Sequence, residues 1–196
     1  MKILSSFNKS KYSFIYILII VTLVTALYRV IPNRIPGFAP QIATIIILGF
    51  FISRRIASVG LIFLSMFLSD SIYEILYRLG YSNIYGFYGM DQFFNYVFLI
   101  SLIGIIWLLK KPNTKKVILS TFMLPSVFYF ISNSYTWLTG GGYSRPMNFG
   151  GYLQCMTDGI PFYWTSLSST IFFTTLYFGL IFFIEKAFLK KLKKTL

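Results

Sequence analysis

Residues 53–78 read SRRIASVGLIFLSMFLSDSIYEILYR, an apolar run between Arg54-Arg55 at one end and Arg78 at the other. The run from 56 to 77 contains no lysine or arginine. At about 1.5 Å per residue a helix of this length rises roughly 33 Å, and the hydrocarbon core of a bilayer is about 30 Å thick. This stretch therefore predicts a transmembrane helix with basic residues at both ends.

Five more apolar segments extend this pattern over the rest of the chain. They lie at about 12–31, 39–53, 92–109, 117–132 and 163–184. The chain has 56% hydrophobic and only 12% charged residues, whereas about 25% of the residues in a soluble domain are charged. We expect an all-α integral membrane bundle of six transmembrane helices, which forms a single transmembrane domain over residues 1–196.

Alternating the loops between these six helices separates the charges. Of the 18 Lys and Arg residues, four fall on one side and 14 on the other; the four are Arg29, Arg34, Arg78 and Arg145. Cytoplasmic loops carry the excess of Lys and Arg, so both termini are predicted to be cytoplasmic in a multi-pass protein of the cell (inner or plasma) membrane. Topology and contact with anionic lipid explain the net charge of +13, and no nucleic-acid partner is expected.

Two features of the composition limit the chemistry. The sequence contains no histidine, which excludes a Ser-His-Asp triad and a histidine metal site. Cys155 is the only cysteine, so an internal disulfide and a thiolate metal cluster are excluded as well. We therefore expect a protein that is not an enzyme and that uses no cofactor and no metal.

Three elements meet on the side predicted to face outward: the end of the helix 56–77, the loop 78–91 and the segment 133–162. The last is predicted to be the longest non-helical stretch. Its glycines at 140–142 and 150–151 and its aromatic side chains predict an ordered lid over a binding site. The aromatic residues on this side fit either an interfacial belt or a stacking pocket for a flat, vitamin-like ligand.

Asp70 and Glu74 are acidic residues within a predicted transmembrane helix. They are four residues apart and therefore share one face of the helix. A carboxylate at this depth indicates a functional site by default. The structural alternative is two ion pairs, Glu74 with Arg78 and Asp70 with Arg29 or Arg34. A cation held between the two carboxylates is a third interpretation.

The other candidate ligand-binding residues lie in the segment 133–162 and just beyond it. Asn133 either caps a helix end or faces a ligand. Cys155 either packs as a small hydrophobic side chain or serves as a soft ligand. The full set of candidates is Asp70, Glu74, Asn133, Tyr135, Trp137, Tyr152, Cys155, Asp158, Phe162 and Trp164.

Six short motifs follow one another along the chain. They are Arg29-x-x-Pro32, Pro40-x-x-Ala43 with Gly49, Ser69-Asp70, Asn133-x-x-x-Trp137, Gly151-x-x-x-Cys155 and Ile160-Pro161-Phe162. From about residue 29 to 179 the chain resembles a family of small bacterial membrane proteins of unknown function, which is similar to the S components of energy-coupling-factor (ECF) transporters. The resemblance implies six helices, cytoplasmic termini and an outward-facing site for a vitamin or a metal. Thr165 and Thr170 replace an amide and an acid that the family usually has, so the resemblance implies no charged role there.

The leading hypothesis is a membrane substrate-binding or transport subunit that captures a small vitamin- or cofactor-like nutrient from the outer side. The sequence has no nucleotide-binding motif, so separate energising transporter subunits are expected as partners, together with the lipid bilayer and a small organic ligand. The alternative is a non-catalytic accessory or structural subunit of a larger complex of membrane proteins.

Overall fold

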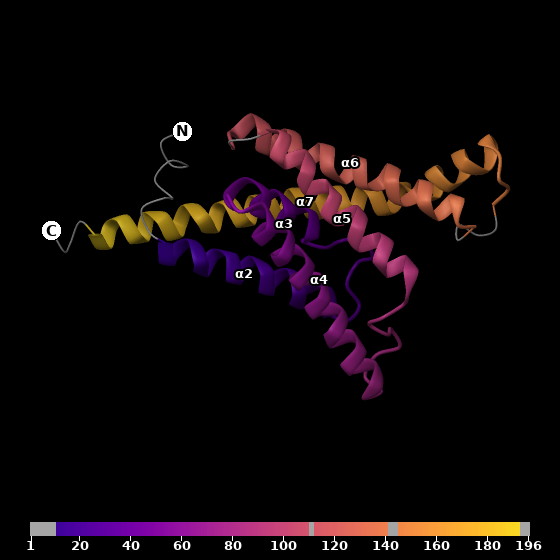
Figure 1. The fold of residues 1–196 in the computed structure, drawn as a ribbon, viewed down its shortest axis with the longest axis horizontal. Coiled ribbons are helices and arrows are strands. Elements are labelled where there is room, and N and C mark those ends of the chain that lie inside the picture. Colours follow the sequence, from indigo (N-terminus) through magenta and orange to yellow (C-terminus); the bar gives the residue numbers. More distant parts are fainter. Residues whose placement is uncertain (1–10, 110–111, 141–144, 193–196) are drawn as a thin grey trace.

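The computed structural model describes residues 11–109, 112–140 and 145–192, and over this part of the chain every regular element is a helix (Figure 1). Six helices follow one another: α2 Lys11–Val30, α3 Gln41–Phe51, α4 Arg55–Arg78, α5 Met90–Leu109, α6 Thr114–Leu138 and α7 Phe149–Leu192. The predicted all-α fold with six helices is confirmed.

Four helices are long and apolar enough to cross a membrane: α4, α5, α6 and the part of α7 from Phe149 to Phe183. Two apolar helices are shorter, namely α3 and Leu18–Val30 within α2. The described part of the chain is therefore that of a multi-pass membrane protein, in which helices satisfy the backbone polar groups internally. Helix α2 begins and α7 ends at the same end of the bundle (Figure 1). Which side of the membrane that end faces stays a prediction.

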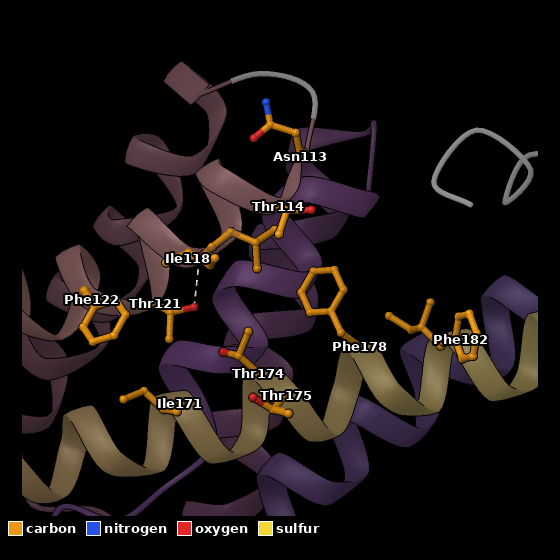
Figure 2. A pocket seen from close by; sticks show the side chains of 12 residues that line it. Asn113, Thr114, Ile118, Thr121, Phe122, Ile171, Thr174, Thr175, Phe178 and Phe182 are labelled. Carbon is orange, nitrogen blue, oxygen red and sulfur yellow. Dashed lines mark hydrogen bonds between the residues drawn. The ribbon is translucent and has the colours of Figure 1, made fainter. Parts of the chain in front are cut away.

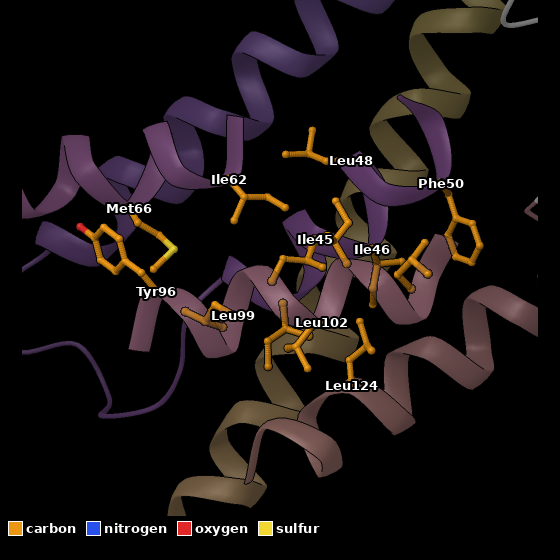
Figure 3. Close-up of a cluster of buried hydrophobic side chains, with 13 residues drawn as sticks. Ile45, Ile46, Leu48, Phe50, Ile62, Met66, Tyr96, Leu99, Leu102 and Leu124 are labelled. Atoms are coloured by element: carbon orange, nitrogen blue, oxygen red, sulfur yellow. The ribbon is translucent and has the colours of Figure 1, made fainter. Parts of the chain in front are cut away.

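The shortest helix, α3, lies at the centre of the bundle. Its 11 residues rise about 16 Å, roughly half the thickness of a hydrocarbon core, and the seven residues from Ile42 to Leu48 are all buried. One hydrophobic cluster joins α3 to α4, α5 and α6, and Figure 3 shows Ile45, Ile46 and Leu102 within it. A second cluster joins α3 to α2 and α7 around Tyr177. Because its neighbours cover it on all sides, α3 is shielded without spanning the membrane.

The prediction that residues 133–162 are non-helical is wrong. Helix α6 continues to Leu138 and α7 begins at Phe149, so only 139–148 lies between helices. The side-chain oxygen of Asn148 accepts a hydrogen bond from the backbone N–H of Gly151 at 2.9 Å, which satisfies a free donor at the start of α7. The glycines at 150 and 151 thus lie in a first helical turn and not in a hinge. Of the predicted lid, residues 141–144 lie outside the described residues.

Helix α7 is much longer than the predicted segment 163–184. Its 44 residues rise about 66 Å, roughly twice the thickness of a hydrocarbon core. It contains Pro161 in its interior. A proline is favourable in the first turn of a helix, so a helix start near residue 163 is the natural reading of the sequence. Apart from these changes around 133–162 and at the end of α7, the predicted helix boundaries differ by three residues or fewer.

The two ends of the bundle carry different segments. The segment 79–89, the end of α6 and the start of α7 lie at one end, which we call the loop end (Figure 1). The opposite, basic end carries the start of α4 at Arg55, the start of α6 and Lys186 near the end of α7. Helices α4 and α5 diverge from α6 and α7 toward the loop end (Figure 1). The charge asymmetry predicts that the loop end faces outward.

Candidate functional site

The strongest electrostatic contact of the described residues is a buried ion pair between α2 and α4. The Arg29 guanidinium lies 2.9 Å from Oδ1 of Asp70, and the two side chains are only 12% and 2% exposed. Arg29 also donates a hydrogen bond to Oγ of Ser69 at 2.6 Å. Arg34 does not pair with Asp70 and instead donates to the backbone oxygen of Arg29 at 3.0 Å. Of the two ion pairs proposed for Asp70, the structure contains the one with Arg29.

Helix α5 supplies the partners of the other carboxylate oxygen of Asp70. Gln92 donates its amide N–H to Oδ2 at 2.6 Å, and the hydroxyl of Tyr96 donates to the same oxygen. Both oxygens of this carboxylate are therefore occupied by protein groups, as a charge in a low-dielectric interior requires. Asp70 joins three helices, and its contacts are those of a structural ion pair.

Glu74 forms the second predicted ion pair. Its Oε1 lies 2.8 Å from Nε of Arg78, one turn further along α4. Its other oxygen accepts a hydrogen bond from the backbone N–H of Gly86 at 3.3 Å. Each carboxylate on α4 thus has its own arginine, which makes a cation shared between the two unnecessary.

The loop 79–89 is pressed against α4 at Gly86. A Cβ atom at this position would collide with the backbone oxygen of Asp70 and lie 2.7 Å from the backbone nitrogen of Glu74. The amide of Gln92 donates to the backbone oxygen of Gly86 at 2.9 Å and accepts from the backbone N–H of Tyr88 at 3.3 Å. The network around Asp70 therefore holds in place the loop that leads from α4 into α5.

Five of the predicted ligand-binding residues instead hold the ends of α6 and α7 together. They are Asn133, Trp137, Tyr152, Cys155 and Asp158. The indole N–H of Trp137 donates to the backbone oxygen of Pro146 at 3.2 Å, and its ring meets that of Tyr152 edge-on at 5.4 Å. Asp158 forms an ion pair with Arg145. These contacts lie within the α6–α7 hairpin itself.

Asn133 does not cap α6, because the helix continues for another turn to Leu138. Its side-chain amide donates to the backbone oxygen of Tyr129 at 2.9 Å. It lies directly against Gly159 of α7, where an added Cβ would collide with it. Cys155 is buried beside it and donates its S–H to the backbone oxygen of Asn133 at 3.5 Å, which agrees with the packing interpretation of this cysteine.

Phe162 and Trp164, the last two predicted site residues, lie on the outside of the bundle. Their relative exposures are 58% and 59%. Neither residue lines any of the cavities described below.

A cavity of about 340 Å³ opens at the loop end between α5 and α6. We call it the α5–α6 cavity. The hydroxyl of Tyr135 in α6 donates to Oδ1 of Asp91 in α5 at 3.1 Å across it. The lining combines a carboxylate, an amide, hydroxyl groups and aromatic rings; it consists of Tyr88, Asp91, Asn95, Phe98, Ser132, Tyr135, Thr136 and Thr139. Of the residues predicted from the sequence, Tyr135 belongs to this lining.

Tyr88 forms the edge of the cavity next to the Asp70 network. Burial raises the pKa of its hydroxyl above the ordinary value. The hydroxyl is therefore neutral at physiological pH and able to donate a hydrogen bond. Since Gln92 binds both the backbone of Tyr88 and the carboxylate of Asp70, the buried ion pair helps to position this edge.

The sequence reasoning missed Asp91 and Asn95, and it included Tyr88 only among the aromatic residues of the side predicted to face outward. A signal was present, because Asp91 and Asn95 are four residues apart and share one face at the start of α5. The predicted segment began at residue 92, which left Asp91 in a loop. A start at Met90 brings both polar side chains onto the helix, facing α6.

The family described as "Family of unknown function (DUF6580)" matches residues 8–193, almost the entire chain. The chain belongs to DUF6580. No curated protein matches this DUF6580 member, and no solved structure matches it. The family's description assigns no activity, so the chemistry of the cavities decides the function proposed for this member.

This DUF6580 member has a larger cavity of about 490 Å³ between α6 and α7 near the basic end, which the sequence reasoning did not predict. Figure 2 shows Phe122, Phe178 and Phe182 around it. Among the described residues, its lining contains no charged side chain, and the buried hydroxyl of Thr174 has no hydrogen-bond partner. With few groups to orient a polar ligand, it is a weaker candidate than the α5–α6 cavity.

Proposed function

We propose that this protein is a non-catalytic membrane subunit that binds a small organic molecule, taken from the outer side of the cell membrane, in the α5–α6 cavity. One observation carries the proposal: a cavity of about 340 Å³ at the loop end combines charged and polar groups with aromatic rings. Small-molecule sites commonly have volumes of about 300–1,000 Å³ and a few polar groups on apolar walls.

Transport is the finer part of the proposal. The order of motifs along the chain resembles that of a family of small bacterial membrane proteins, and this family is similar to ECF S components, whose binding sites face outward. A six-helix bundle with a cavity at the loop end supports the same role. The sequence contains no nucleotide-binding motif, so separate energising subunits would have to drive release of the ligand on the inner side.

The test is mass spectrometry of small molecules extracted from protein purified in a mild detergent. We expect the wild-type protein to retain one compound in stoichiometric amount. Thr136→Trp places an indole in the cavity lining and should abolish retention. Thr157→Trp, on an exposed face of α7, is the matched control and should retain the compound.

Two results would contradict this function. In the first, the wild-type protein retains no compound and a protein partner co-purifies in equal amount. This result would favour the accessory-subunit alternative. The second is equal retention by Thr136→Trp and the wild type, which would place the compound outside the α5–α6 cavity.

A further inference from the structure

Asp91 differs from the other acidic residues whose side chains the structure describes. Asp70, Glu74 and Asp158 each form an ion pair with an arginine. Within the described residues, Asp91 instead accepts a hydrogen bond from the hydroxyl of Tyr135. The eight residues that line the α5–α6 cavity include no lysine and no arginine. Among the described residues, the lining therefore presents the negative charge of Asp91 and no positive side chain.

The start of α5 compensates this charge only in part. Asp91 lies in the first helical turn, where the helix dipole acts as roughly half a positive charge. An approaching cation would meet the remaining negative potential of Asp91, whose side chain is exposed in the lining of the cavity.

Aromatic rings line the same cavity or lie next to it. The rings of Phe98 and Tyr135 meet edge-on at 5.3 Å and 71°, and the ring of Phe94 lies 4.7 Å from that of Tyr135. Phe98 and Tyr135 also line a second depression, of about 440 Å³. Ring faces carry negative electrostatic potential and attract ammonium groups. Carboxylate and rings thus favour the same ligand charge.

We propose that the α5–α6 cavity selects a small organic cation that carries an amine or quaternary ammonium group. Asp91 is the charge partner, and Tyr135 orients its carboxylate. Phe98 and Tyr135 supply ring faces, and the second depression accommodates an apolar arm of the same molecule. This inference rests on the proposed function, because it names the class of molecule bound in that cavity.

The test compares two probes of the same shape, choline and its neutral isostere 3,3-dimethylbutan-1-ol, by calorimetric titration of the full chain in detergent. We expect choline to bind at least tenfold more tightly than the isostere. Asp91→Asn should remove this preference, and Asp91→Glu should keep part of it. Asp158→Asn removes one charge from the same end of the molecule, outside the cavity lining, and should change the affinity less than twofold.

Several results would overturn the inference. Three results would show that Asp91 interacts only with the first turn of α5 and binds no cation. They are equal binding of the two probes, no binding of choline at millimolar concentration, and an unchanged preference for choline in Asp91→Asn. An anionic or neutral compound that is extracted from the wild type and lost in Thr136→Trp would retain the proposed function and refute the cationic ligand. A failure of the function itself would appear as retention unaffected by Thr136→Trp.

Discussion

At the scale of single residues, the buried charges of this bundle are each matched by a specific partner. Arg29 and Asp70 are withdrawn from solvent, and Ser69, Gln92 and Tyr96 complete their hydrogen bonds. Removing one member of a buried pair leaves an uncompensated charge, which commonly costs about 3–5 kcal/mol. Replacing both members by apolar side chains is often far less costly.

The first prediction follows from this asymmetry. Asp70→Leu should lower the free energy of unfolding by about 3–5 kcal/mol because Arg29 is left unpaired, and the double variant Arg29→Met/Asp70→Leu should recover a large part of the loss. Glu74→Gln is the control, and its expected cost is much smaller because Arg78 is largely exposed. Denaturant unfolding in detergent micelles measures all three. Equal stability of Asp70→Leu and Glu74→Gln would show that the buried pair does not stabilise the bundle.

At the scale of elements, the loop 79–89 and the start of α5 act as one unit. Gly86 lies against the backbone of α4, and Gln92 ties the loop to Asp70. Tyr88 and Asp91 line the α5–α6 cavity within this unit. A displacement of the loop therefore changes the cavity as well as the contact with α4.

The second prediction concerns Gly86→Ala. The added methyl group collides with backbone atoms of α4, so we expect a loss of about 1–3 kcal/mol, typical of overpacking, and weaker binding of choline. The control is Gly60→Ala in α4, where the added methyl group meets open space. This change should raise the free energy of unfolding by about 0.5–1 kcal/mol, as alanine does in a helix interior. Thermal unfolding and titration of both variants check this. A neutral Gly86→Ala would mean that the loop is free to move away from α4.

The helices show where sequence reasoning succeeds and where it fails. Long apolar runs between basic residues predict α4, α5 and the middle of α7 because burial in lipid requires this composition. The first part of α7, before residue 163, was not predicted to be helical because Gly150, Gly151 and Pro161 are signals for turns. Its helical state depends on packing against α6, through pairs such as Trp137 and Tyr152, which no local pattern reveals.

The site was less predictable than the fold. The Arg29–Asp70 pair was one of two pairings that the sequence allowed, since both Arg29 and Arg34 lie near the same end of α2. The role proposed for Asp91 depends on a comparison of partners, because three other carboxylates have an arginine and Asp91 has Tyr135. Such a comparison requires the tertiary structure.

At the scale of the whole molecule, the third prediction is the orientation in the membrane. The 14-to-4 asymmetry of Lys and Arg predicts that both termini lie in the cytoplasm. In a Cys155→Ser background, Lys193→Cys should resist a membrane-impermeant thiol reagent in intact cells, and Asn83→Cys in the loop 79–89 should react. Reaction at position 193 together with protection at position 83 would reverse the orientation and place the α5–α6 cavity on the cytoplasmic side.

The short central helix α3 also has a consequence for biogenesis. A segment of 11 residues is shorter than the roughly 17–25 residues that a helix needs to cross a bilayer, so the insertion machinery has little basis for releasing it into lipid as an independent span. Its final position depends on α4, α5, α6 and α7, all of which are synthesised after it. Ribosome-bound chains that end before α5 should therefore leave α3 accessible, and its integration should be completed only once the later helices have emerged.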